Sequence, residues 1–386
     1  MNAPDLPVER LPVSLLTGFL GSGKTTVLKH LLGHPGMANT AVIINEFGEV
    51  GLDHLLVEAT ADRPVLLDSG CLCCTVRGDL IDTLRRLFKQ RAKGEIPAFR
   101  RVVIESTGLA DPAPILHTLM SDPLVADRFR LDGVIATVDA VNGMDQLDRQ
   151  PESVKQAAVA DRLVLTKIDL ADGAALAGLR QRLRTLNPAA PMIEAQQGAV
   201  EPSALLGAGL FQTADKIPDV AAWLRAEAYE TPTHGHGHGE RRQDDHGHAE
   251  HGHAEHGHAE HGHASHDHAS HDHGALDRNR HDDRIRAFAI AHDRPLDWPR
   301  FASWIEGLIA THGDRLLRIK GVLEVEGLAE PVAIHGVQHL FHPPASLPGW
   351  PAGPRRSQLV FILRDLEETA IRESFAEMVA GAAQAR

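Results

Sequence analysis

Short apolar runs alternate with amphipathic stretches over residues 13–215. The runs are almost continuously apolar, which is typical of strands buried on both faces of a parallel sheet. Between them, apolar residues recur at three- and four-residue spacing, as in residues 78–91, and this predicts helices with one apolar face. The alternation predicts an α/β domain with a mostly parallel sheet flanked by helices. The predicted strands are residues 13–17, 41–45, 64–68, 101–105, 133–139, 162–167 and 191–195.

A second set of apolar runs occupies residues 285–386. Here runs of strand character outnumber the helical patterns, which predicts a smaller α+β domain with a largely antiparallel sheet. The strands are expected within residues 285–292, 315–327, 331–342 and 357–365, and the helices over residues 298–312 and 366–380.

A histidine-rich tract from Thr233 to His273 separates the two patterns. Within it a five-residue unit repeats, first as HGHAE and later as HDHAS. The tract has no apolar residue larger than alanine and cannot bury a core, so it is predicted to be a disordered linker. We therefore divide the chain into residues 1–228, 229–284 and 285–386. Histidines alternating with Asp and Glu would form many weak metal-chelating sites, and a solubilising spacer is the alternative.

Charge and composition exclude several classes of protein. The formal net charge of −13 argues against a nucleic-acid binder. The sequence contains neither an apolar run of 18 residues nor a signal-peptide pattern at its N-terminus, so no membrane contact and a cytoplasmic location are expected. In that reducing compartment an odd set of three cysteines disfavours a disulfide framework.

Residues 18–25, GFLGSGKT, match the complete phosphate-binding pattern G-x-x-x-x-G-K-[ST]. The match directly follows a predicted strand and opens a helix, which is the context that the pattern requires. Backbone N–H groups of such a loop surround phosphates, and the helix N-terminus favours negative charge. Lys24 is predicted to reach the β- and γ-phosphates, and the Thr25 hydroxyl to ligate Mg²⁺.

Two further strand ends fit a nucleotide site. Glu105 ends an apolar strand and is followed by Gly108, as expected of a carboxylate on the metal side of the site and a switch loop. The stretch LTKID, residues 165–169, resembles a base-recognition motif. The Asp169 carboxylate can accept hydrogen bonds from guanine N1–H and its 2-amino group, whereas adenine offers neither donor, so GTP is preferred over ATP.

All three cysteines, Cys71, Cys73 and Cys74, stand within four positions. Thiolates are soft ligands that suit Zn²⁺, and a set of three leaves one position for a carboxylate, a water or a partner's ligand. Glu49 in the acidic stretch of residues 45–53 is the best candidate for an oxygen ligand. Reversible oxidation of neighbouring thiols is the alternative.

The motifs GFLGSGKTT, NEFGEVGLD, SGCLCC, ESTGLADPAP and LTKID occur in this order along the chain. Together with LLRIKGVLEVEG after the histidine-rich linker, they resemble the CobW-type family of P-loop GTPases over nearly the whole chain. Where some relatives carry a further acidic residue this chain has Ile44, which affects the expected coordination shell. Hydrogenase- and urease-maturation GTPases are less similar, because the tract here lies between two domains.

The resemblance implies a GTPase that binds zinc or another transition metal and delivers it to a client metalloprotein. The alternatives are a cobalt-handling GTPase of cobalamin synthesis and a histidine-rich metal store or redox-regulated GTPase. The resemblance assigns GTP and Mg²⁺ to Gly18, Gly21, Ser22, Gly23, Lys24, Thr25 and Thr26, the second switch to Glu105 and Gly108, guanine recognition to Thr166, Lys167 and Asp169, and zinc (with cobalt as an alternative) to Cys71, Cys73, Cys74 and Glu49.

Overall fold

The structure is a computed structural model that describes residues 10–44, 65–68, 76–208, 284–341, 343–350 and 355–384. The described residues belong to one compact unit, residues 1–230 together with residues 279–386. The second unit, residues 231–278, contains none of them. The predicted linker, residues 229–284, thus lies almost wholly outside the described residues, and its disorder stays a prediction.

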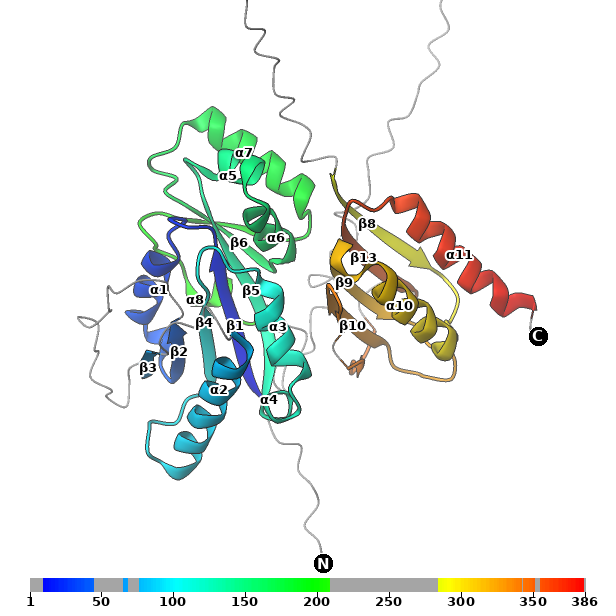
Figure 1. Ribbon diagram of the computed structural model, residues 1–386, viewed down its shortest axis with the longest axis horizontal. Coiled ribbons are helices and arrows are strands. Elements are labelled where there is room, and N and C mark those ends of the chain that lie inside the picture. Colours follow the sequence, from blue (N-terminus) through cyan, green and yellow to red (C-terminus); the bar gives the residue numbers. More distant parts are fainter. Residues whose placement is uncertain are drawn as a thin grey trace, which may run out of the picture. The chain divides into compact units, whose positions relative to one another are not determined.

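Seven strands form a parallel sheet in the order β3-β2-β4-β1-β5-β6-β7, with β1 in the middle (Figure 1). Each of the seven strands predicted in residues 13–195 is present. The sheet continues from β1 with β5, β6 and β7 on one side and with β4, β2 and β3 on the other, so successive connections lead to both sides of β1. Sheets of this kind bind ligands at the carboxyl ends of the strands where the direction of the connections changes, which here is the carboxyl end of β1. The strands are β1 (Leu11–Gly18), β2 (Thr40–Ile44), β3 (Val65–Asp68), β4 (Arg101–Glu105), β5 (Phe129–Asp139), β6 (Arg162–Thr166) and β7 (Met192–Ala195).

The connecting helices begin at sequence signals that explain their positions. Asp111, Asp122 and Asp172 each accept backbone N–H groups from the first turn of the helix that follows, as N-cap residues do. Two of these helices also have proline in the first turn, where a missing N–H costs nothing. The helices are α1 (Lys24–Leu32), η1 (Pro35–Met37), α2 (Val76–Lys93), α3 (Pro112–Ser121), α4 (Pro123–Arg128), α5 (Gly143–Arg149), α6 (Pro151–Val159), α7 (Gly173–Leu186) and α8 (Pro202–Leu205).

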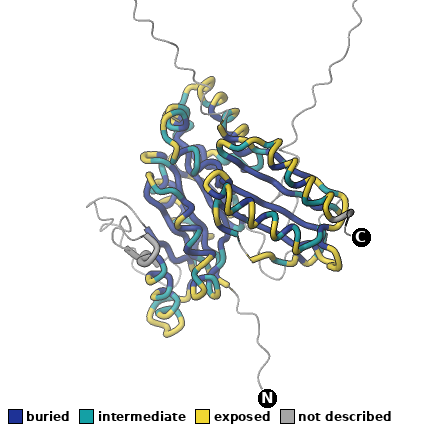
Figure 2. The backbone as a smooth tube through the Cα atoms, turned by 45° about the vertical axis from the view of Figure 1, so that its right-hand side comes forward, coloured by how far each residue is buried: buried dark blue, intermediate teal, exposed yellow. Residues whose placement is uncertain are grey.

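Both faces of the parallel sheet are buried. On one face, Val13 and Leu15 of β1 share a core cluster with residues of α2 and α3. On the other, Leu16 shares a cluster with Val27 and Leu28 of α1. Figure 2 shows the strands as buried and the outward sides of the helices as exposed. This two-sided burial is the reason that the strands read as continuous apolar runs in the sequence.

The C-terminal residues form a separate antiparallel sheet with the path β11-β10-β9-β13-β8, and β12 pairs with β10. Phe301 and Ile305 of α10 and Phe375 of α11 are buried in one core cluster with strand residues. The predicted α+β architecture is therefore confirmed. The elements are β8 (Ile285–His292), α10 (Trp298–His312), η4 (Gly313–Arg315), β9 (Leu316–Leu323), β10 (Val332–Val337), β11 (Leu340–Phe341), β12 (Ala345–Ser346), β13 (Ser357–Arg364) and α11 (Glu368–Gln384).

Asp161, a buried carboxylate directly before β6, connects this part of the parallel sheet to β9. Its Oδ2 accepts the Val134 N–H at 2.9 Å, and its Oδ1 accepts Lys320 Nζ at 2.8 Å as well as a bond from Arg318. Arg318 also donates to the carbonyl of Val159. Burial alone would raise the pKa of Asp161, but the charges of Arg318 and Lys320 hold it well below its usual range.

Across the part of the chain that the structure describes, no helix combines the length and the apolar character needed to cross a membrane.

Candidate nucleotide site

The phosphate-binding loop joins β1 to α1 at the carboxyl edge of the parallel sheet. Gly18 has φ 139° and Gly23 has φ 88°, conformations that residues with a Cβ rarely adopt. A Cβ on Gly18 would also lie 2.2 Å from Thr137 Oγ1 and 2.5 Å from the Thr137 carbonyl oxygen. Gly23 caps α1 with no side-chain hydrogen bond. The first N–H groups of α1 therefore have no side chain capping them, and they can bind phosphate oxygens.

Lys24, the first residue of α1, lies across the loop that precedes it. Its Nζ donates to the carbonyl oxygens of Gly18 at 3.0 Å and Phe19 at 3.2 Å, and the residue is only 8% exposed. The ammonium is thus held over the loop that the pattern assigns to phosphate, where phosphate oxygens can take the place of these carbonyls.

Thr25 and Glu105 meet at the same edge. The Thr25 hydroxyl donates to Glu105 Oε1 at 2.9 Å, and Glu105, the last residue of β4, is 1% exposed. Two residues predicted independently, from positions 80 apart, are therefore in direct contact. Because this hydroxyl donates a hydrogen bond to Glu105, the lone pairs of its oxygen remain available to a cation. An all-oxygen donor set of this kind suits Mg²⁺.

Thr166 supports the phosphate-binding loop from β6. Its hydroxyl donates to the Ser22 carbonyl at 2.7 Å and it is 3% exposed. Ser22 Oγ in turn shares a 2.6 Å hydrogen bond with Thr137 Oγ1. These contacts connect Thr166 to the loop beneath the phosphates, and its predicted contact with the base stays a prediction.

The predicted base-recognition residues lie just after β6. Lys167, at φ 56°, donates from Nζ to Asp139 Oδ2 at 2.7 Å, while Asp169 is exposed. Burial would raise the pKa of Asp139, but hydrogen bonds from Lys167, Asn142 and two backbone N–H groups outweigh it and lower the pKa below its ordinary value. Lys167 is thus oriented by a buried carboxylate next to the exposed Asp169, whose role in base recognition stays a prediction.

The segment after β4 is packed against the phosphate-binding loop. Ser106 Oγ donates to Thr17 Oγ1 at 2.9 Å. A Cβ on Gly108 would lie 2.6 Å from the backbone N of Leu20, so only glycine allows this close approach. Gln156 of α6 donates to the carbonyls of Gly108 at 3.2 Å and Ala110 at 3.0 Å. The predicted second switch is therefore in direct contact with the phosphate-binding loop, so a change in the loop can alter its position.

The predicted metal ligands, Cys71, Cys73, Cys74 and Glu49, lie outside the described residues. The elements on either side of the cysteines are described: β3 ends at Asp68 and α2 begins at Val76. Asp68 is in register with Ile44, and Ile44 with Glu105. The chain thus enters the cysteine segment from the sheet edge that carries Glu105. No cluster of three or more potential metal ligands occurs within the described residues.

Sequence reasoning missed three polar residues around this site: Thr137, Asp139 and Gln156. They contact the loop, Lys167 and the second switch segment respectively. Asp139 had a weak signal, because it ends an apolar strand as Glu105 does. Thr137 and Gln156 had none, since their importance depends on partners more than 40 residues away.

Comparison with known families gives two matches that together cover most of the chain. Residues 12–194 match the CobW/HypB/UreG nucleotide-binding domain. Residues 285–379 match the cobalamin synthesis protein CobW C-terminal domain.

Individual relatives match over nearly their full length. The zinc chaperone YjiA of Escherichia coli (strain K12) is 32% identical over 366 residues, which cover 95% of this chain and 98% of the relative. The zinc chaperone CobW of a Sinorhizobium species is 27% identical, with coverage of 96% and 98%. A crystal structure of Zn(II)-bound YjiA GTPase from E. coli superimposes with a TM-score of 0.65 at 28% identity, over 96% of this chain and 99% of that chain.

Proposed function

The chain belongs to the CobW family of nucleotide-binding proteins, and from that premise we propose that it is a GTPase that carries zinc and delivers it to a client metalloprotein. The observation that carries the proposal is the direct contact of Thr25 with Glu105, at the sheet edge from which the chain enters the cysteine segment. The zinc-chaperone relatives support the choice of metal.

Hydrolysis of GTP depends on positioning and on neutralising charge. We assign phosphate binding to the backbone of residues 18–26, and to Lys24 the neutralisation of charge on the β- and γ-phosphates. Thr25 and Glu105 would hold Mg²⁺, which neutralises phosphate charge when bound. The described residues around the loop include no obvious general base, so we expect slow intrinsic turnover.

The cargo site is assigned to Cys71, Cys73 and Cys74, with Glu49 as an additional ligand. Zinc is preferred because three thiolates suit it and because the relatives are zinc chaperones. Cobalt handling is the alternative for the same ligands. Three protein thiolates leave zinc one further coordination position, and exchange of Glu49 for a client's ligand at that position would suit a metal that has to be released. The client is expected to be a metalloprotein in the same reducing compartment, the cytoplasm.

Coupling between the two sites is what distinguishes a metallochaperone from a GTPase that merely contains a metal. If one conformational change responds to both ligands, GTP must change zinc affinity by the same factor as zinc changes GTP affinity. We expect a factor of about 5–150, the range of common allosteric couplings. The measurement is zinc affinity by competition with a chromogenic chelator, with a non-hydrolysable GTP analogue, with GDP and without nucleotide.

Three variants identify which residues cause any nucleotide dependence of zinc affinity. The triple variant Cys71→Ser, Cys73→Ser, Cys74→Ser should lose the nucleotide-dependent zinc binding and keep GTP binding. Deletion of residues 234–273 should reduce zinc capacity and leave the coupling factor unchanged. Lys24→Ala should remove the coupling. Equal zinc affinities in all nucleotide states would refute the proposal.

Two other outcomes would replace it. Loss of nearly all tight zinc on deletion of residues 234–273 would indicate a metal store. Reversible thiol oxidation without tight zinc binding would indicate a redox-regulated GTPase.

A further inference from the structure

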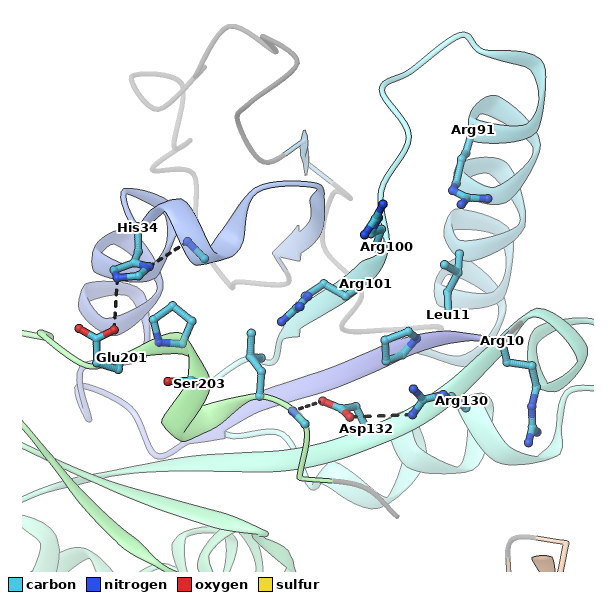
Figure 3. A pocket seen from close by; sticks show the side chains of 15 residues that line it. Arg10, Leu11, His34, Arg91, Arg100, Arg101, Arg130, Asp132, Glu201 and Ser203 are labelled. Carbon is cyan, nitrogen blue, oxygen red and sulfur yellow. Dashed lines mark hydrogen bonds and ion pairs between the residues drawn. The ribbon is translucent and has the colours of Figure 1, made fainter. Parts of the chain in front are cut away.

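A pocket rich in arginine lies at the amino edge of the parallel sheet, opposite the edge that carries the nucleotide site (Figure 3). It has a volume of about 860 Å³. Leu11, the first residue of β1, lines it, whereas the phosphate-binding loop follows Gly18, the last residue of the same strand. Eight strand residues separate the two sites by roughly 23 Å at about 3.3 Å per residue. The pocket is therefore distinct from the nucleotide site.

Five arginines line this arginine pocket, and they come from separate segments of the chain. Arg91 belongs to α2, Arg100 and Arg101 lead into and begin β4, Arg10 precedes β1, and Arg130 belongs to β5. Figure 3 shows Arg100 and Arg101 between the helix that carries Arg91 and the side formed by His34 and Glu201. The chain as a whole is acidic, with a formal net charge of −13, whereas this pocket concentrates positive charge.

The lining contains two acidic residues, the buried Asp132 and the exposed Glu201. Asp132 accepts Ser14 Oγ at 3.0 Å and the Gly207 N–H at 2.8 Å. It lies 3.9 Å from Arg130 and is 6% exposed. Glu201 pairs with His34 at 3.3 Å. Neither carboxylate is placed to neutralise Arg91, Arg100 or Arg101.

Three of the arginines present donors to the pocket. Among the described residues, the Arg100 and Arg101 side chains form no hydrogen bond or ion pair, and Arg100 is exposed. Arg91 is held in place by its Nε, which donates to the Phe99 carbonyl at 2.9 Å, and its guanidinium lies 5.5 Å from the centre of the Phe99 ring. Its terminal nitrogens are left to bind other groups. These guanidiniums line one pocket without an ion pair to either of its carboxylates, so their like charges repel and a bound anion would neutralise them.

We propose that the arginine pocket binds an acidic segment of a partner protein. Guanidinium groups match carboxylates with two parallel hydrogen bonds, and here they are spread over several walls. That spread suits several spaced carboxylates better than one phosphate group. Leu11, Pro12, Pro202 and Leu206 supply apolar lining between the charges, which suits a peptide with acidic and apolar side chains interspersed.

The test uses the full chain and a short fluorescein-labelled peptide built from Glu-Ala-Glu-Leu repeats, with binding measured by fluorescence anisotropy. Neither nucleotide nor zinc is added, so the outcome is independent of the proposed GTPase activity. The wild type should bind the peptide, with affinity falling as salt increases. A peptide with glutamine in place of every glutamate should not bind.

The double variant Arg100→Ala, Arg101→Ala should weaken binding at least about tenfold, because it removes two charge-assisted partners. The matched control is Arg149→Ala, Arg184→Ala, which removes the same charge from exposed positions on α5 and α7. This control should change affinity by less than about twofold. If the pocket double variant fails to fold, Arg100→Ala alone, at an exposed position, provides the same comparison.

Two results would overturn the proposal. One is absence of peptide binding to the wild type, or an equal loss in both double variants, which would indicate diffuse attraction only. The other is tight binding of inorganic tripolyphosphate, lost in Arg100→Ala, without any binding of the peptide. The pocket would then be a site for small phosphate anions.

Discussion

The two edges of the parallel sheet hold their charged side chains in different ways. At the carboxyl edge, Lys24 bonds to carbonyls five and six residues before it, within one loop. At the amino edge, Asp132 holds Gly207, 75 residues away, and Asp161 holds Arg318, 157 residues away. Both edges contain contacts between distant residues, such as that of Thr25 with Glu105 at the carboxyl edge. At the carboxyl edge, however, a local loop positions a cation, Lys24, for a ligand, whereas the buried carboxylates of the amino edge serve to connect distant segments.

This difference between the two edges predicts that one set of residues serves nucleotide binding and the other serves stability. Residues at the carboxyl edge face a space that phosphates are expected to fill, so changing them should alter nucleotide handling more than folding. Asp132 and Asp161 have no role toward nucleotide in this arrangement, so changing them should alter folding more than nucleotide handling. The following four variants test this contrast, from the largest expected effect to the smallest.

Asp161→Asn should lower the free energy of unfolding by about 3–5 kcal/mol, because it leaves Arg318 and Lys320 buried without their carboxylate. Urea denaturation at neutral pH measures the loss. Asp145→Asn is the matched control, because its ion pair with Arg149 is exposed, and it should change stability by less than about 1 kcal/mol. A loss equal to that of the control would show that the buried network contributes nothing.

The same pair predicts a pH dependence. The pKa of Asp161 is lowered in the folded protein, because Arg318 and Lys320 outweigh the effect of burial. The unfolded chain therefore binds a proton more readily, and the stabilisation is lost as pH falls below about 4. The loss of stability between about pH 5 and pH 2 should be smaller in Asp161→Asn than in the wild type.

Lys24→Ala should reduce kcat/KM for GTP by about 10²–10³, or about 2.7–4 kcal/mol, the typical cost of removing one charge-stabilising group. Steady-state phosphate release measures it. Lys29→Ala, at an exposed position on the same helix, should leave the rate unchanged. The unfolding midpoint of Lys24→Ala should stay near that of the wild type. Strong destabilisation by this variant would break the separation between the two edges.

Asp169→Asn should weaken GTP binding by about 1.5–3 kcal/mol, because a charged acceptor for guanine N1–H and the 2-amino group becomes an amide. Xanthine carries a carbonyl where guanine carries the 2-amino group, so XTP should gain relative to GTP. Competition against a fluorescent GDP analogue measures both affinities. Asp172→Asn, at the N-cap of α7, is the control and should leave nucleotide preference unchanged. Unchanged preference in Asp169→Asn would remove this residue from base recognition.

Ser14→Ala should cost about 1 kcal/mol of stability, since it removes one buried hydrogen bond to Asp132 at 3.0 Å. GTP turnover should be unchanged, because Ser14 lies four residues before Gly18, where the phosphate-binding loop begins, and its side chain bonds to Asp132. Ser203→Ala, at an exposed position in the lining of the arginine pocket, should cost less than about 0.5 kcal/mol. A drop in turnover without a loss of stability would contradict the assignment of Ser14 to the fold.

Prediction from sequence succeeded where the determining residues are contiguous. The sequence predicted all seven strands of the parallel sheet, α2 and the main elements of the C-terminal domain. Burial on one face produces a periodic pattern of apolar residues, and burial on both faces produces a continuous apolar run. Two motifs placed Thr25 and Glu105 separately at the nucleotide site, and the structure brings them into contact at 2.9 Å, which neither motif predicted. The hydroxyl bond of Thr166 to the Ser22 carbonyl was not predicted, because the two residues are 144 positions apart, and its predicted base contact stays a prediction.

The sequence by itself determined the nucleotide chemistry, the family and the three cysteines as the candidate metal site. A phosphate-binding loop is a local structure, and its glycines, Lys24 and Thr25 are adjacent in the chain. Only the tertiary structure decided which strand neighbours which, that Asp161 joins β9 to β6, and that arginines from four segments line one pocket. Such groupings arise from packing between residues distant along the chain, and no local pattern records which partners will meet.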